Sequence, residues 1–159
     1  MATISTLDIN GATHPTMNGN VRIPYTVDFV LDFAKALTAK GSALAAADVI
    51  EVLDIPAGSV VLSVGAEVTA VADSTTLTLT VGTGADADEW VAALDGKTLG
   101  WSADLDSVPT VNTYAAADTI DVTLATLTGT LTSGKVRVFA TMIDVSDKSR
   151  RPGIAQLKS

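Results

Sequence analysis

The residues of this chain that could perform chemistry are few: one histidine, His14, and some small groups of carboxylates. A catalytic histidine needs a positioned nucleophile or carboxylate, and a metal site normally needs several ligands. His14 precedes Pro15, and the sequence holds no cysteine and no second histidine. We therefore interpret His14 as a surface residue, and we expect no metal and no cofactor.

The densest group of carboxylates is Asp86-Ala87-Asp88-Glu89, whose oxygen atoms would suit calcium. In an EF-hand loop an oxygen ligand stands at the fifth position and glycine at the sixth, but here Trp90 and Val91 occupy them. Asp104-Leu105-Asp106 fits no better. Acidic residues also favour the first turn of a helix. The sequence therefore predicts a short helix over Asp86–Leu94.

A pair of carboxylates could also hydrolyse a glycosidic bond, provided that both face one cleft. Aromatic side chains usually line such clefts, but only 4% of this chain is aromatic. Trp90 and Trp101 could stack on a sugar, although the large area that tryptophan buries equally suits a core or an interface. We expect no enzyme activity, and we retain Trp90 and Trp101 as candidate oligomer or glycan anchors.

The elements that would position these residues are mainly strands, because apolar and polar residues alternate along much of the chain. Strands are predicted over Val49–Ile55 and Val60–Val71, joined by a turn at 56–59, with Gly65 as a candidate bulge. A second hairpin-like pair is predicted over Thr119–Leu127 and Lys135–Val145. Two further alternating segments complete the set, Tyr25–Phe33 and Thr75–Val81.

The segment 34–47 favours helix by its alanine, leucine and lysine content, but Gly41-Ser42 interrupts it. We interpret it as a connecting loop with room for one helical turn. Six to eight strands with little helical periodicity indicate an all-β fold. The expected architecture is an antiparallel two-sheet sandwich or jelly roll with one short helix and extended N- and C-terminal segments.

Charge is distributed unevenly over the 159 residues, whose net charge is −8. Residues 41–134 contain thirteen acidic residues and one basic residue, whereas residues 135–159 contain six basic and two acidic residues. An acidic body repels nucleic acid phosphates, and no apolar run approaches the roughly 20 residues of a membrane helix. We expect neither nucleic acid nor membrane as a partner.

These patterns divide the chain into an extended N-terminal arm (1–20), a β-sandwich or jelly-roll domain (21–145) and a basic C-terminal tail (146–159). Charged runs are usually solvated, but the tail could also anchor the protein to an acidic partner. The candidate partner contacts are the four basic residues of the tail, Lys148, Arg150, Arg151 and Lys158.

Several segments between residues 48 and 145 resemble small virion proteins of tailed bacteriophages, including cyanophages. These segments are Asp54–Val61, Ala66–Thr69, Val81-Gly82 with Asp86–Asp88, and Gly134–Val138 with Ile143-Asp144. Proteins of that group are typically capsid decoration, or cement, proteins, and many are β-rich trimers on the outer capsid surface. The resemblance implies the major capsid protein as partner, a homotrimer, and a virion location after synthesis in the cytoplasm of the bacterial host.

Three other functions remain open at this point. One is a tail, fibre or head-fibre component of the same kind of particle. Another is a carbohydrate-binding module, which would need Trp90 or Trp101 on an exposed face. The third is a hydrolase that uses acidic residues.

Overall fold

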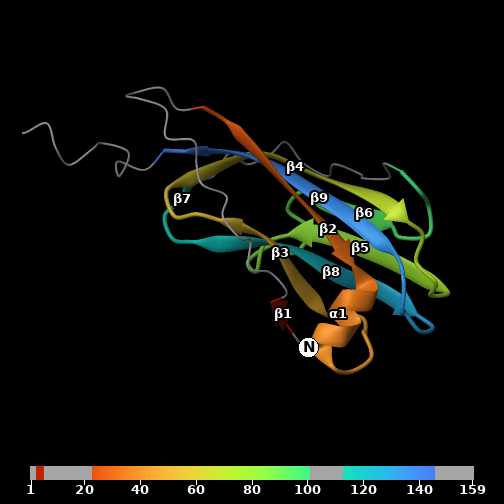
Figure 1. Cartoon of the computed structure of the whole chain (residues 1–159). Coiled ribbons are helices and arrows are strands. Elements are labelled where there is room, and N and C mark those ends of the chain that lie inside the picture. The colour runs from red at the N-terminus through yellow and green to blue at the C-terminus, as the bar shows by residue number, and fades with distance from the viewer. Residues whose placement is uncertain (1–2, 6–22, 101–112, 146–159) are drawn as a thin grey trace, which may run out of the picture.

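The computed structural model describes residues 23–100 and 113–145 in full and residues 3–5 as backbone. In these ranges the chain forms nine strands and one helix, and the strands build two sheets that enclose a core (Figure 1). The four-stranded sheet contains β2 (Tyr25–Asp32), β4 (Ser59–Ala70), β7 (Thr113–Tyr114) and β9 (Lys135–Asp144). The five-stranded sheet contains β1 (Thr3–Ser5), β3 (Val49–Ile55), β5 (Thr76–Gly82), β6 (Val91–Asp95) and β8 (Asp118–Thr128).

The strand order is that of a jelly roll. The four-stranded sheet runs β2-β9-β4-β7 and the five-stranded sheet β1-β3-β8-β5-β6. Apart from β1, the pairs are nested in the sequence: β2 with β9, β3 with β8, β4 with β7 and β5 with β6. Each of these pairs is antiparallel, and only β1 runs parallel to its neighbour β3. Eight strands nested in this way form two Greek keys, so the predicted antiparallel sandwich or jelly roll is confirmed.

The predicted hairpin-like pairs, in contrast, are wrong. The turn at 56–59 joins β3 in one sheet to β4 in the other, and β8 and β9 likewise lie in different sheets. The turn itself is as expected: Ser59 N donates to Pro56 O at 3.1 Å, and Gly58 has a φ of 84°. These turns therefore carry the chain across the sandwich, and the ladder partners come from distant strands.

The core lies between the inward faces of the two sheets and consists of small and branched apolar side chains. On β9, alternate residues from Val136 to Met142 are fully buried, and the opposing sheet buries Leu79, Val81 and Leu124 to the same degree. Threonines of β5 take the outer face, as in the cross-strand pair of Thr76 with Thr128. The strict alternation in β5 and β9 thus arises because one face of each strand packs on the core and the other faces solvent.

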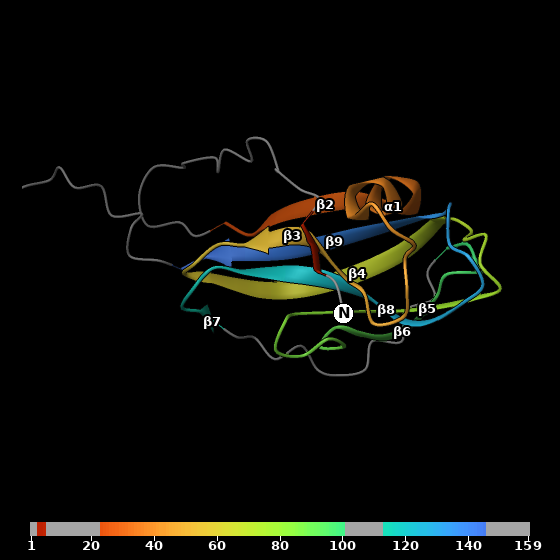
Figure 2. The ribbon, with the colours of Figure 1, turned by 90° about the horizontal axis from the view of Figure 1, so that it is seen from below.

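Helix α1 (Phe33–Lys40) begins where β2 ends, inside the segment that we expected to be a loop with one helical turn. The Asp32 carboxylate caps it by accepting a hydrogen bond from Ala34 N at 3.0 Å. Gly41 ends it with a φ of 70°, and its N–H donates to Leu37 O. Figure 2 shows α1 lying along the end of β2, so the one short helix exists, but not where acidic residues predicted it.

The predicted helix over Asp86–Leu94 is wrong, because Val91–Asp95 is strand β6. Val91 and Leu94 both reach the core, which a bulge opposite Leu79 and Val81 permits. The preceding acidic residues form a turn, in which Glu89 N donates to Asp86 O at 3.4 Å. Their side chains are therefore loop carboxylates with no helix dipole to favour them.

Gly65 is not a bulge, since the irregularities of β4 fall between Val61 and Ser63 and between Val68 and Ala70. It pairs with Phe139 on the outer face of the four-stranded sheet. A Cβ at Gly65 would lie 2.2 Å from Phe139 Cζ, so the glycine makes room for the aromatic ring. The sequence signal at Gly65 was real, but its cause is a cross-strand neighbour.

Candidate functional site

The two ends of the sandwich differ in charge, and this difference defines the candidate site. One end, called the acidic end here, comprises the start of β2, the end of β9, the turn at 56–59, the turn at 83–90 and the start of β8. Eight carboxylates lie at or near it, namely Glu51, Asp54, Asp86, Asp88, Glu89, Asp118, Asp121 and Asp144. The five basic residues in the described ranges all lie away from it, on α1, after β6 or at the start of β9.

The acidic end contains a hollow of about 530 Å³ between the turn at 83–90 and the segment 113–118. Three carboxylates line it, Asp86, Glu89 and Asp118, together with Tyr114 and small residues. Glu89 Oε2 accepts hydrogen bonds from Thr83 Oγ1 at 3.3 Å and from the Tyr114 hydroxyl at 3.5 Å. The hollow thus brings together carboxylates from two loops that are about 30 residues apart in the sequence.

The electrostatics of the hollow reflect crowded negative charge. Burial raises the pKa of Glu89, the Thr83 hydrogen bond opposes this, and the charge of Asp86 adds to it. Burial also raises the pKa of Tyr114, and the charges of Glu89 and Asp118 raise it further. Such a site favours a cation, because a positive charge would relieve this repulsion.

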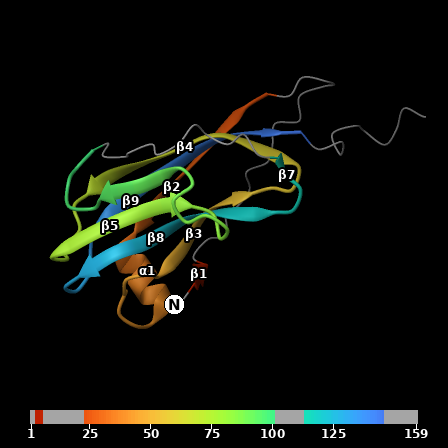
Figure 3. The same cartoon turned by 180° about the vertical axis from the view of Figure 1, so that it is seen from behind.

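Asp121 on β8 extends the acidic end onto the outer face of the five-stranded sheet, in which β8 lies between β3 and β5 (Figure 3). It lies directly opposite Glu51 on β3 and opposite Gly82 on β5. Its side chain is only 5% exposed, and its Oδ1 has no hydrogen-bond partner. Burial raises the pKa of Asp121, a hydrogen bond from Thr119 opposes this, and the charges of Glu51 and Asp118 add to the rise.

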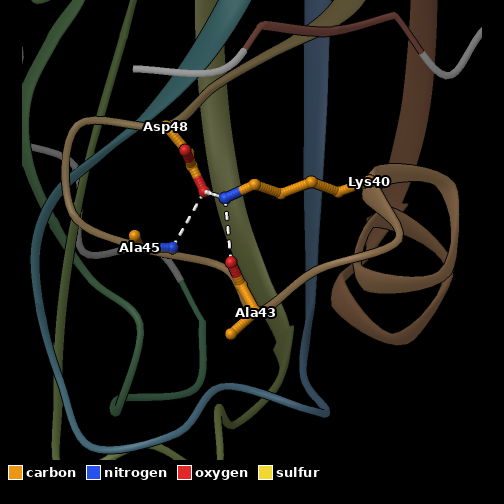
Figure 4. A network of polar contacts seen from close by, with 4 residues as sticks. All are labelled: Lys40, Ala43, Ala45 and Asp48. Carbon is orange, nitrogen blue, oxygen red and sulfur yellow. Dashed lines mark hydrogen bonds and ion pairs between the residues drawn. The ribbon is translucent and has the colours of Figure 1, made fainter.

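The opposite end of the sandwich has its charges paired. Figure 4 shows Lys40 Nζ donating to the Asp48 carboxylate and to Ala43 O, while Ala45 N donates to the same carboxylate at 2.8 Å. Both charged side chains are mostly covered, with 12% and 4% exposed. Lys97 Nζ donates to the backbone oxygens of Ala72 and Ser74. These contacts fix loops, so we assign them a structural role.

On the outer face of the four-stranded sheet, both basic residues are paired with carboxylates. Arg137 on β9 pairs with Asp28 on β2 at 3.0 Å, and Lys135 pairs with Asp32 at 3.2 Å. Exposed pairs of this kind contribute about 0–1 kcal/mol each. Glu67 on β4 also lies opposite Arg137, so this face carries charges of both signs with a small acidic excess.

The structure describes only some of the candidate residues named from the sequence. Trp90 is 5% exposed and packs in the core, which favours its packing role over an anchor role. His14, Trp101, the pair Asp104 and Asp106, and the tail residues Lys148, Arg150, Arg151 and Lys158 lie outside the described residues. Their proposed roles stay predictions. No motif or spacing indicated that Glu89, Tyr114 and Asp118 would lie together, because the strand pairing of the jelly roll brings them together.

Within the described residues, no group of three or more histidine or carboxylate side chains is arranged to hold a metal ion. No helix among them is long and apolar enough to cross a membrane. The arrangement at the acidic end can instead bind positively charged side chains, because its carboxylates lie at the surface of an open hollow.

The fold recurs in solved structures of phage capsids. The chain matches a chain in the capsid of Ralstonia phage GP4 with a TM-score of 0.60 and 18% identity, covering 91% of this chain and 99% of that one. Lower similarity is found to chains in an acid-stable capsid structure of Helicobacter pylori bacteriophage KHP30 (TM-score 0.49, 16% identity, 78% and 90% covered) and in the capsid asymmetric unit of cyanophage Pam1 (TM-score 0.46, 19% identity, 86% and 99% covered). No protein-family model matches the chain, and no curated protein matches it significantly.

The comparison defines a class of fold. This chain and the GP4 capsid chain share one jelly roll over nearly their whole lengths. The resemblance to phage virion proteins that the sequence predicted is thus confirmed at the level of the fold.

Proposed function

We propose that the protein is a structural component of a phage capsid, and specifically a decoration protein that binds the major capsid protein on the outer surface of the particle. The observation that carries this proposal is the match of 91% of this chain to 99% of a chain in the GP4 capsid. The match runs over nearly the full length of both chains, so it includes the whole jelly roll.

The shape of the molecule suits such a role. A decoration protein must be rigid, and the jelly roll buries apolar side chains from β2, β3, β4, β5, β6, β8 and β9. The acidic body keeps copies soluble before assembly. The basic tail residues Lys148, Arg150, Arg151 and Lys158 supply attachment to a surface of opposite charge.

We propose further that three copies act together as a homotrimer. Three linked attachments raise the effective concentration of each one at the capsid, so that weak single contacts add up to stable binding. Light scattering tests the oligomer directly: a trimer has three times the 16.2 kDa of one chain. A monomer at micromolar concentration would contradict this part of the proposal.

The function itself is tested by co-sedimentation of the purified protein with capsids assembled without it. We expect saturable binding, and we expect a reconstruction to place the protein on the outer surface. The variant K148A/R150A/R151A/K158A should bind more weakly, whereas Lys35→Ala on exposed α1 serves as a matched control. No binding, combined with absence from purified virions by mass spectrometry, would reject the proposal. Density on the tail or a fibre would instead establish the alternative virion role.

A further inference from the structure

The turn at 83–90 packs on the outer face of the five-stranded sheet, beside a buried carboxyl group. Alternate residues of β5 up to Val81 point into the core, so Gly82 faces outward. A Cβ at Gly82 would lie 2.0 Å from Asp86 O, which shows that the backbone of the turn covers this position. Asp121 on β8 is the cross-strand neighbour of Gly82. The turn therefore lies next to Asp121.

The surroundings of Asp121 do not suit a negative charge. Its side chain is only 5% exposed, and its Oδ1 has no hydrogen-bond partner. On β3, Glu51 lies directly opposite and Asp54 lies opposite Thr119, while β8 itself adds Asp118 and the hydrogen bond from Thr119. No titratable side chain comes from β5, and the turn adds only carboxylates, namely Asp86, Asp88 and Glu89. Like charges directly opposite each other destabilise a sheet, and a buried charge without a partner is costly.

Of the elements around Asp121, the turn is the one that is free to move. Strand β8 is an inner strand, paired with β3 on one side and with β5 on the other. In the turn, residues 84–88 are all exposed, and the hydrogen bond from Thr83 N to Asp86 O at 2.7 Å lies within the turn itself. Segments with few buried contacts open locally at a small cost in free energy.

We propose that the turn at 83–90 is a pH-sensitive cover of Asp121, closed while this carboxyl group holds its proton and open once the proton is lost. Ionisation places an uncompensated charge beside Glu51, and opening of the turn admits water that solvates this charge. Because the turn also lines the acidic hollow, opening takes Glu89 away from the Tyr114 hydroxyl. The inference concerns the free chain and does not depend on the proposed capsid role.

The direction of the pH effect follows from burial. Burial raises the pKa of Asp121 in the closed state, and the charges of Glu51 and Asp118 add to the rise. In the open state water returns the pKa toward its ordinary value. Below that value Asp121 is protonated in both states, so the opening equilibrium is level. Above it the opening equilibrium increases with pH, by about tenfold for each unit between the two pKa values.

Amide hydrogen exchange followed by NMR measures the opening of the turn. The reporters are the N–H groups of Thr83 and Trp90, and the Gly96 N–H, which donates to Leu77 O at 3.0 Å, serves as the reference at the other end of the pair β5 and β6. Exchange rates are divided by their intrinsic values to give opening constants. We expect those of Thr83 and Trp90 to rise several-fold from about pH 4 to about pH 7. They should exceed that of Gly96 by at least about tenfold, because the turn opens without unfolding the sheet.

Two variants assign the pH dependence to one carboxyl group. Asp121→Asn should remove most of the rise, because the amide stays uncharged. Glu89→Gln is the matched control, since it removes a carboxylate from the turn itself and should leave most of the rise. A rise as large in Asp121→Asn as in the wild type, or a greater loss in Glu89→Gln, would overturn the proposal. If Asp121→Asn fails to fold, a wild-type opening constant of Thr83 that is level with pH, or equal to that of Gly96, overturns it as well.

Discussion

Gly82 is the position where one added carbon atom tests the acidic end most directly. A Cβ there would lie 2.0 Å from Asp86 O and 2.5 Å from the carbonyl carbon of Ala87. Both are backbone atoms of the turn at 83–90, which Thr83 N fixes by donating to Asp86 O at 2.7 Å. Gly82→Ala therefore forces the turn to move by more than about 1 Å to reach ordinary contact distance.

The expected cost follows from three contributions. Overpacking costs about 1–3 kcal/mol, and the strained hydrogen bond loses about 1 kcal/mol. Replacing glycine by alanine restricts the unfolded chain, which returns about 0.4–1 kcal/mol. We expect Gly82→Ala to lower the free energy of unfolding by about 2 kcal/mol.

Urea unfolding followed by tryptophan fluorescence measures this change, because Trp90 packs in the core beside the turn. Gly84→Ala is the matched control: it lies in the same turn, and a Cβ there would meet nothing within 4 Å. Its free energy of unfolding should stay within about 0.5 kcal/mol of the wild type. If Gly82→Ala is as stable as Gly84→Ala, the turn does not lie over β5 as described.

The remaining predictions concern the Lys40–Asp48 ion pair, the outer face of the four-stranded sheet and the acidic end. Asp48→Asn leaves Lys40 covered without its counter-charge and should cost about 3 kcal/mol in urea unfolding, whereas Lys35→Met on the same helix should be near neutral. Gly65→Ala should cost about 1 kcal/mol through contact with Phe139, and the loss should shrink in a Phe139→Ala background; an equal loss there would contradict the pairing. The raised pKa of Asp121 means that its contribution to stability is fully present below the unfolded value of about 3.9 and is lost as pH rises from there through the higher folded value. Asp121→Asn should therefore gain stability relative to the wild type between pH 3.5 and pH 7, and a difference that is flat with pH would refute the assignment.

The strands could be predicted from the sequence, but their partners could not. The alternation in Thr76–Gly82 and Lys135–Asp144 shows which side chains face the core, and the structure places them there. Alternation does not encode which strand lies alongside, because any strand with one apolar face can cover the core. The nearest candidates in sequence, β3 with β4 and β8 with β9, were therefore the natural and incorrect choice.

The errors over the short elements have local causes. Trp90–Leu94 is a run of five apolar residues, which fits a helix or a buried strand equally well, and the acidic residues before it favoured the helix. In the structure Val91–Asp95 forms a strand because it pairs with β5. The site could not be predicted for a related reason: Glu89 lies in the turn at 83–90 and Asp118 in β8, and only the nested strand pairing brings them to one end.

The nested pairing has a consequence for synthesis. Strand β2 appears early on the ribosome, but β9, its one ladder partner in the part of the chain that the structure describes, lies more than 100 residues later, with Tyr25 opposite Met142. Loop closure over such a separation is slow, and the hydrogen-bonding groups of β2 that pair with β9 stay unpaired until β9 has emerged. Any nascent chain that stops before residue 135 lacks β9, the inner strand that joins β2 to β4 in the four-stranded sheet. We therefore expect truncated copies to be unstable and short-lived.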